Sequence, residues 1–197
     1  SVHHYGTKIL NESNKIGYKR GVAMGLLTSD RVFDGDTSIV RPDPNREKAA
    51  NQAMQIGKDA GDEEVMGCAS VVLNSFASER TLHSATQQLQ TIEHFKKAGK
   101  LVRAAYLQTW LADFYTDIGE YEKAFDCARE NLRDLKNIHS PELTSIYRQS
   151  LIWTEWVMSQ IFSAAGDYEG ALQHLLISNQ IDKADDPSAD ASLDISG

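Results

Sequence analysis

The stretch GEYEKAFDCARENL, residues 119–132, returns 47 residues later as GDYEGALQHLLISN, residues 166–179. Both copies keep a glycine, an acid, a tyrosine, a second acid and an alanine at the same offsets. Glycine readily takes the left-handed conformation that ends many helices. The tyrosine is predicted to start the next helix while packing back on its partner, and the alanine to stand where two helix backbones approach closely. The repetition predicts helical hairpins that stack on one another.

Helical periodicity extends from these copies over most of the chain. In residues 81–98 and 101–118 the apolar residues follow the three-and-four spacing of a half-buried helix. No run alternates with period two over a useful length, so an all-α fold is predicted. The predicted helices cover residues 3–16, 21–33, 46–60, 64–77, 81–98, 101–118, 121–138, 142–165 and 168–182.

Turn signals divide these helices into repeats. Gly17, Gly61, Gly99 and His139 stand at the turns, 44, 38 and 40 residues apart. We therefore expect one repeat domain over residues 1–182, made of an extra N-terminal helix and four hairpins. The predicted hairpins cover residues 21–60, 64–98, 101–138 and 142–182. Residues 34–45, rich in Asp, Gly and Pro, predict a long loop, and the acidic residues 183–197 predict a disordered tail or linker.

The composition excludes several classes of protein. With 41% apolar and 24% charged residues it is typical of a folded domain. The net charge of −8 and the lack of a basic stripe argue against direct contact with nucleic acid or an anionic membrane. No apolar run approaches the roughly 20 residues of a membrane span, and no signal peptide is visible.

The two cysteines and the two ends of the chain suggest its setting. Cys68 and Cys127 lie in apolar segments and are interpreted as core thiols, which indicates a reducing compartment, most simply the cytoplasm. A first residue other than Met, together with the linker-like tail, suggests a segment of a larger protein.

Motifs that carry catalysis or bind metals are absent from the sequence. There is no glycine-rich phosphate loop, Gly-x-Ser-x-Gly, His-Glu-x-x-His or Cys-x-x-Cys. His3 and His4 are adjacent but lack further ligands, and the aspartates of residues 34–43 lack the glycine and closing glutamate of a calcium loop. The remaining histidines are interpreted as surface residues: His83, His94, His139 and His174. No enzymatic activity, metal or cofactor is predicted.

The repeated stretch resembles the tetratricopeptide repeat (TPR), a family of helical hairpins. The family's offsets are occupied in residues 107–132 by Leu111, Ala112, Tyr115, Gly119, Tyr121, Ala124, Ala128 and Leu132. In residues 158–179 they are occupied by Phe162, Gly166, Tyr168, Ala171 and Leu175. The first two hairpins lack the Gly-x-Tyr signature. A period near 40 residues, instead of about 34, is similar to the expanded repeats of bacterial regulatory proteins, including helix-turn-helix activators, sensor kinases, diguanylate cyclases and peptide-responsive regulators.

This resemblance implies a right-handed superhelix whose concave face binds a protein or peptide. In the family the first helix of each hairpin lines that face. The register from Gly119 and Gly166 places these residues on it: Tyr106, Thr109, Asp113, Thr116, Asp117, Trp153, Trp156, Gln160 and Ser163. The first two hairpins would add Met24, Leu27, Arg31, Cys68, Ser75 and Glu79. Trp110 is expected in the core.

The implied groove is aromatic and acidic. Trp153 and Trp156 lie one helical turn apart and either anchor a partner or pack against a following helix. Asp113 and Asp117 suit either a solvated face or recognition of a basic peptide. The family's clamp for C-terminal carboxylates needs Lys and Asn where this chain has Thr109 and Asp113, so a chaperone tail is not the expected ligand.

Two functions from different classes remain open. The first is a non-catalytic regulatory module of a larger bacterial signalling or transcription-regulatory protein, which binds a protein or a peptide, a basic peptide being one alternative for the aspartates. The second is a structural scaffold that self-associates, with the tryptophan-bearing helix as the dimer face.

Overall fold

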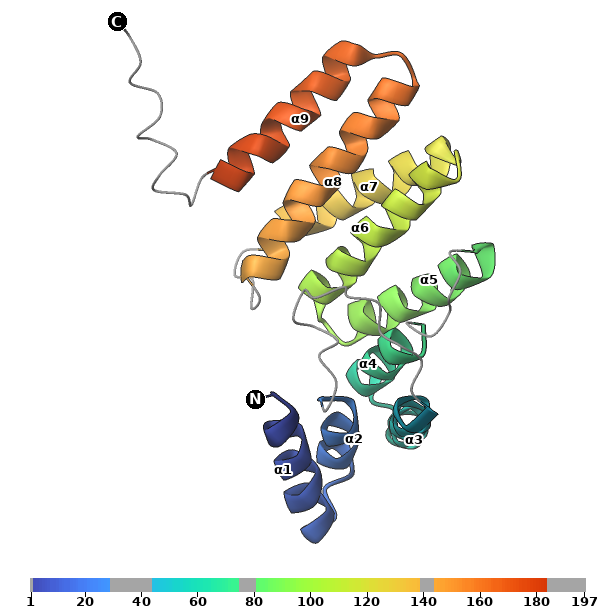
Figure 1. Ribbon diagram of the computed structural model, residues 1–197, viewed down its shortest axis with the longest axis vertical. Coiled ribbons are helices and arrows are strands. Elements are labelled where there is room, and N and C mark those ends of the chain that lie inside the picture. The colour runs from blue at the N-terminus through green and yellow to red at the C-terminus, as the bar shows by residue number, and fades with distance from the viewer. Residues whose placement is uncertain (1, 29–43, 75–80, 139–143, 184–197) are drawn as a thin grey trace, which may run out of the picture. The chain divides into compact units, whose positions relative to one another are not determined.

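The computed structural model describes residues 2–28, 44–74, 81–138 and 144–183 (Figure 1). Within these ranges the chain forms nine α-helices and no strand, which confirms the predicted all-α fold. The helices are α1 (Val2–Lys15), α2 (Lys19–Thr28), α3 (Pro44–Ala60), α4 (Glu63–Asn74), α5 (Leu82–Lys97), α6 (Leu101–Asp117), α7 (Tyr121–Lys136), α8 (Thr144–Ala164) and α9 (Tyr168–Lys183). Most of the predicted loop and tail, and the predicted groove residues Arg31, Ser75 and Glu79, lie outside the described residues.

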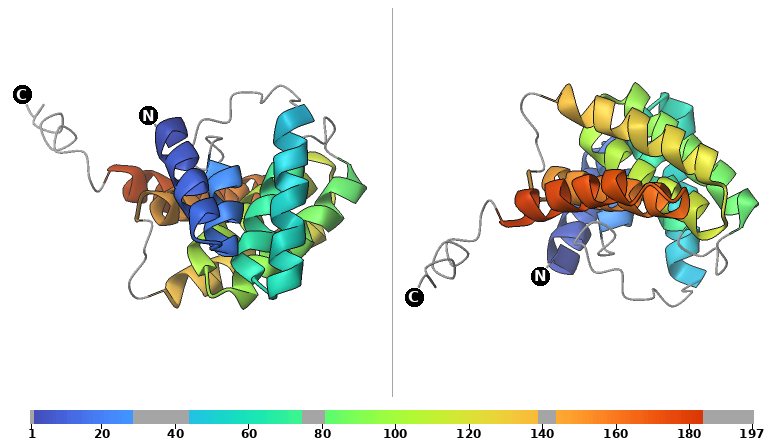
Figure 2. Two further views of the ribbon diagram at one scale, coloured as in Figure 1. Left: turned by 90° about the horizontal axis from the view of Figure 1, so that it is seen from below. Right: turned by 90° about the horizontal axis from the view of Figure 1, so that it is seen from above.

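The chain divides into two compact units, Ser1–Lys100 and Leu101–Gly197. In the first unit α1 packs against α2, α3 against α2 and α4, and α5 against α4 (Figures 1 and 2). The N-terminal helix is therefore not an isolated addition, because it forms a hairpin with α2. In the second unit α6 pairs with α7 and α8 with α9, and α8 also packs against both α6 and α7.

Glycine closes both hairpins of the repeated stretch through its backbone. Gly119 and Gly166 have φ angles of 77° and 80°, in the left-handed region. In both turns the amide of the next residue bonds to a carbonyl five residues back, Glu120 N to Tyr115 O at 2.9 Å and Asp167 N to Phe162 O at 3.0 Å. This pattern satisfies carbonyls that the helix end would leave unpaired. Gly17, Gly61 and Gly99 have the same positive φ.

Replacing Gly119 with Ala is expected to lower the free energy of unfolding by about 1 kcal/mol, because an L residue is strained at this φ. A Cβ at this position would meet no atom within 4 Å, so the cost is conformational and not steric. Gly119→Asn is the matched control and should cost less, since Asn tolerates the left-handed region. Urea unfolding followed by circular dichroism measures both. Equal costs for Ala and Asn would contradict the conformational explanation.

The acidic residue after the glycine has different roles in the two copies. Asp167 caps α9, since its Oδ1 accepts a hydrogen bond from Gly170 N at 2.9 Å. Asp62 caps α4 in the same way, through Val65 N at 3.1 Å. Glu120 makes no such bond to α7. The shorter side chain therefore serves as a helix cap, and the glutamate keeps only the favourable charge near the helix N-terminus.

The core of the second unit lies where α8 meets α6 and α7. One cluster of buried apolar residues joins the three helices: Ala112, Ala124, Ala128, Leu132, Val157, Met158 and Ile161. Ala124 is completely buried, in agreement with its predicted place at a close helix approach, and its counterpart Ala171 is half-buried. The prediction that the tyrosines pack back on their partners is wrong for Tyr168, which is 74% exposed, and Tyr121 is also exposed, at 45%.

None of the helices in the described part of the chain is both long enough and apolar enough to cross a membrane.

Candidate interaction surface

A row of three aromatic side chains crosses from α6 to α8. The Tyr106 and Trp110 rings lie 6.3 Å apart with an interplanar angle of 75°, and the Trp110 and Trp153 rings lie 4.9 Å apart at 74°. Both contacts are edge-to-face, a favoured geometry for aromatic pairs. All three residues are half-buried. Trp110 was predicted in the core but lies at its border, between the two residues predicted for the groove.

Two carboxylates extend this row along α6. Tyr106, Trp110, Asp113 and Asp117 are spaced four, three and four residues apart, so they follow one side of the helix. Asp113 is half-buried and Asp117 is exposed. The predicted groove residues Tyr106, Asp113 and Asp117 therefore lie on one side of α6 together with Trp110, which was predicted in the core, and Trp110 contacts Trp153 of α8. This set is called the aromatic–acidic surface below.

Thr109 does not belong to this surface, which corrects the predicted groove. Its side chain is only 1% exposed, because α8 packs over it. The Thr109 and Thr154 hydroxyl oxygens are 2.9 Å apart, and Asn131 Nδ2 donates to both oxygens at 2.9 Å. Helical spacing alone places Thr109 beside Asp113, but the contact among α6, α7 and α8 removes it from solvent. It is a core residue that joins three helices.

Trp153 and Trp156, predicted to act together, have different surroundings. Trp153 packs edge-on against Trp110, whereas Trp156 is 44% exposed. Counting back 47 residues, Trp156 corresponds to Thr109, the position that α8 covers. Trp156 therefore lies on the side of α8 that corresponds to the α6 surface against which α8 packs. Gln160 is exposed on the same helix.

The remaining predicted groove residues are distributed between surface and core. Ser163 is exposed, while Thr116 and Met24 are half-buried. Leu27 and Cys68 are 7% and 2% exposed, so both are core residues and the weaker register of the first two hairpins gave wrong positions for them. Cys127 is half-buried, and its thiol donates to the carbonyl of Gln108 on α6 at 3.4 Å.

Two histidines interpreted as surface residues instead hold helices together. His94 Nδ1 on α5 lies 2.6 Å from Glu63 Oε2 on α4, and His174 Nδ1 on α9 lies 2.6 Å from Glu155 Oε2 on α8. Glu155 is buried, and the His174 ring also stacks on Phe162 at 5.1 Å. These pairs join residues far apart in sequence, so neither spacing nor composition could have identified them.

Charged residues of the first unit form a network between α2 and α4. Arg20 bonds to Asp62 and, at 2.6 Å, to Glu64, while Lys100 Nζ lies 3.9 Å from Glu64. Burial lowers the pKa of Arg20, but the bonds and charges of Glu64 and Asp62 outweigh it and raise that pKa above its ordinary value. Arg20 therefore stays charged and ties α2 to the start of α4. In the described residues, no three His, Cys, Asp or Glu side chains are grouped to hold a metal ion.

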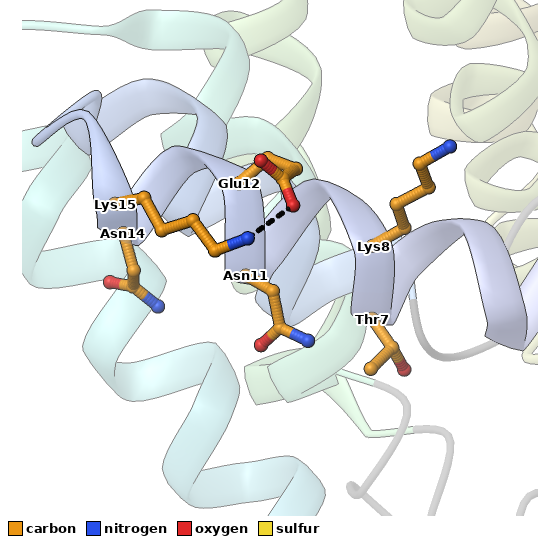
Figure 3. Close-up of a pocket in the computed structure, with 6 residues that line it drawn as sticks. All are labelled: Thr7, Lys8, Asn11, Glu12, Asn14 and Lys15. Carbon is orange, nitrogen blue, oxygen red and sulfur yellow. Dashed lines mark hydrogen bonds and ion pairs between the residues drawn. The ribbon is translucent and has the colours of Figure 1, made fainter.

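A surface hollow of about 420 Å³ lies along α1 (Figure 3). All six lining residues come from this one helix: Thr7, Lys8, Asn11, Glu12, Asn14 and Lys15. Lys15 Nζ bonds to Glu12 at 2.7 Å, and both side chains are well exposed. Because all of its lining residues belong to this one exposed helix, the hollow lacks the enclosing walls of a ligand pocket.

The aromatic–acidic surface thus carries aromatic rings and carboxylates along one side of α6. Comparisons of the chain with protein-family models, with curated proteins and with solved structures found no match in any of the three.

Proposed function

We propose that the chain is a non-catalytic, protein-binding module whose aromatic–acidic surface recognises a basic segment of a partner. The single observation that carries this proposal is the row of Tyr106, Trp110 and Trp153 beside Asp113 and Asp117. Half-buried aromatic residues are common anchors of interfaces, because they add contact area and lose little conformational freedom on binding.

The chemistry of this surface favours a cationic ligand. A Lys or Arg side chain can lie over the face of a tryptophan ring and bond to a nearby carboxylate. Two aspartates one turn apart concentrate negative charge, and the whole chain carries a net charge of −8. The negative electrostatic potential of these charges increases the rate at which a basic partner associates and disfavours binding of an acidic partner.

The wider setting is proposed from the resemblance to tetratricopeptide repeats. Two hairpins closed by equivalent glycines, with α8 packed against both helices of the preceding hairpin, support a TPR-like superhelix. In that setting the chain is a regulatory segment of a bacterial signalling or transcription-regulatory protein in the cytoplasm. If the superhelix exchanges between two conformations of different curvature, a bound partner shifts the equilibrium toward the conformation that it binds more tightly.

A second candidate function, self-association, is favoured by a different observation. The last helix, α9, exposes several large apolar side chains, which is unusual for a helix at a solvated surface. This surface is separate from Asp113 and Asp117, so the two functions do not exclude each other.

Selection of peptides displayed on phage, with the full chain as bait, tests the proposed binding. We expect enriched peptides to contain Lys or Arg next to an aromatic or aliphatic residue. The double variant Asp113→Asn, Asp117→Asn should bind them at least about tenfold more weakly, since a bond to a charged group contributes about 1.5 kcal/mol or more.

The matched control removes two carboxylates, also one turn apart, from exposed positions of α7: Asp126→Asn with Glu130→Gln. It changes the net charge by the same amount and should leave binding within about twofold, since long-range attraction is screened by salt. Enrichment of peptides without basic residues, or an equal loss in both double variants, would contradict the proposal.

A further inference from the structure

The outer side of α9 carries a stripe of large apolar side chains. Tyr168, Leu172, Leu175 and Leu176 are 74%, 55%, 38% and 49% exposed. The opposite side of the helix faces α8, through the bond of His174 to Glu155 and the bond that Ser178 donates to Ile152 O at 3.0 Å. The stripe is thus not the part of α9 that packs against α8 within the hairpin.

The internal repeat shows what covers such a stripe in this chain. An offset of 47 residues aligns α7 with α9, so that Phe125 and Ala128 correspond to Leu172 and Leu175. Phe125 packs edge-on against Phe162 of α8 at 6.1 Å, and Ala128 is completely buried. Tyr121 and Arg129, the counterparts of Tyr168 and Leu176, are exposed on α7, so α8 covers the part of α7 that corresponds to Leu172 and Leu175.

The side of α8 that carries Trp156 is also exposed, although the corresponding side of α6 is buried. Thr109 on α6 is 1% exposed because α8 lies over it, whereas its counterpart on α8, Trp156, is 44% exposed. The surface formed by Leu172, Leu175 and Trp156 therefore corresponds to the site on α6 and α7 where α8 packs. It has the shape and chemistry to receive one more amphipathic helix. Figure 1 shows α8 and α9 side by side, with α6 and α7 on the other side of α8.

We propose that a second copy of this chain supplies that helix, with its own α9. Tyr168, Leu172, Leu175 and Asn179 are spaced four, three and four residues apart, which is the seam of a two-helix coiled coil. The seam is therefore suited to a copy of itself, in a two-fold symmetric interface.

Charges at the ends of α9 favour the same partner in antiparallel orientation. Between Glu169 and Asp182 the helix has no Asp, Glu, Lys or Arg, so two copies can meet without burying a like-charge pair. Glu169, Leu176 and Lys183 are each seven residues apart and form one column beside the seam. An antiparallel copy brings the acidic end of this column near the basic end of the other. Four exposed side chains form the stripe, so we expect a weak dimer that forms only toward the higher protein concentrations.

Sedimentation equilibrium of the full chain from about 1 µM to about 1 mM tests the proposal. The mass should rise from 21.9 kDa toward twice that value. The double variant Leu172→Glu, Leu176→Glu should stay at 21.9 kDa while circular dichroism shows an unchanged helix content. Both leucines are exposed, so these substitutions leave the core of the hairpin intact.

Two control variants distinguish a dimer formed through α9 from association through another surface of the chain. Leu82→Glu with Leu89→Glu changes two equally exposed leucines of α5 and should dimerise like the native chain. Asp113→Asn with Asp117→Asn should also dimerise, even though it loses the proposed peptide binding. A native chain that stays at 21.9 kDa throughout, a dimer that survives the α9 substitutions, or equal loss in the α5 control would each overturn the proposal.

Discussion

Substituting His174 with Ala is expected to lower the free energy of unfolding by about 3 kcal/mol. The His174 ring lies 2.6 Å from Glu155, whose side chain is 8% exposed, and stacks on Phe162. Without the imidazole, the carboxyl group of Glu155 loses its partner on α9 but remains buried between the helices. The loss of a partner by a buried charged group costs more than the pair contributes, since the remaining group cannot regain its hydration.

A second substitution distinguishes this mechanism from simple loss of packing. Replacing Glu155 with Gln in the His174→Ala background removes the charge but keeps the shape, so it should restore roughly half of the lost stability. His83→Ala, at an exposed position of α5, is the control and should change stability by less than about 0.5 kcal/mol. Urea unfolding by circular dichroism gives all values. A loss without recovery in the double variant would show that the ring acts through packing alone.

Substituting Gly25 with Ala is expected to cost about 2 to 3 kcal/mol in the first unit. A Cβ on Gly25 would lie 2.7 Å from the backbone nitrogen of Leu10 and 2.8 Å from its Cα. These are backbone atoms of α1, so no side-chain rotation can relieve the contact and the two helices would have to separate. Unfolding monitored as above measures the cost.

Whether Gly25→Ala lowers or raises the free energy of unfolding tests the close approach of α1 and α2. Alanine has the higher helix propensity and by itself would stabilise α2 by about 1 kcal/mol. The control Lys19→Ala, at an exposed position of the same helix, should be close to neutral. If Gly25→Ala stabilised the protein, α1 and α2 would not approach each other at this point, and the hairpin of these two helices would need revision.

The helices could be predicted from the sequence because their signals are local. Apolar spacing and the glycine turns depend on neighbouring residues, so every predicted helix is present, and Gly119 and Gly166 have the expected backbone conformation. The pairing of α1 with α2 was missed because their contact depends on a glycine in the helix interior. Gly25 allows the close approach because it has no side chain, and the spacing of apolar residues does not reveal such a contact.

The candidate site could be predicted only in part, for a tertiary reason. Helical spacing predicted Tyr106 and Asp113 on one side of the helix, but it could not separate Thr109 from them, because Thr109 is buried by a helix 45 residues away. Exposure of the repeat tyrosines differs for the same reason: Tyr121, on a helix against which α8 packs, is 45% exposed, whereas Tyr168, on a helix followed by no described helix, is 74% exposed. Burial of a repeat position depends on the next repeat, and that information is not contained in the repeat itself.

The side-chain N–H signals of the three tryptophans provide the most direct test of the proposed binding surface. The full chain, labelled with ¹⁵N, would be titrated with the most enriched basic peptide while the indole resonances are followed by NMR. We predict that Trp110 and Trp153 shift and that Trp156 does not, at a protein concentration low enough to keep the chain monomeric. Shifts limited to Trp156, or none at any of the three, would contradict recognition by the aromatic–acidic surface.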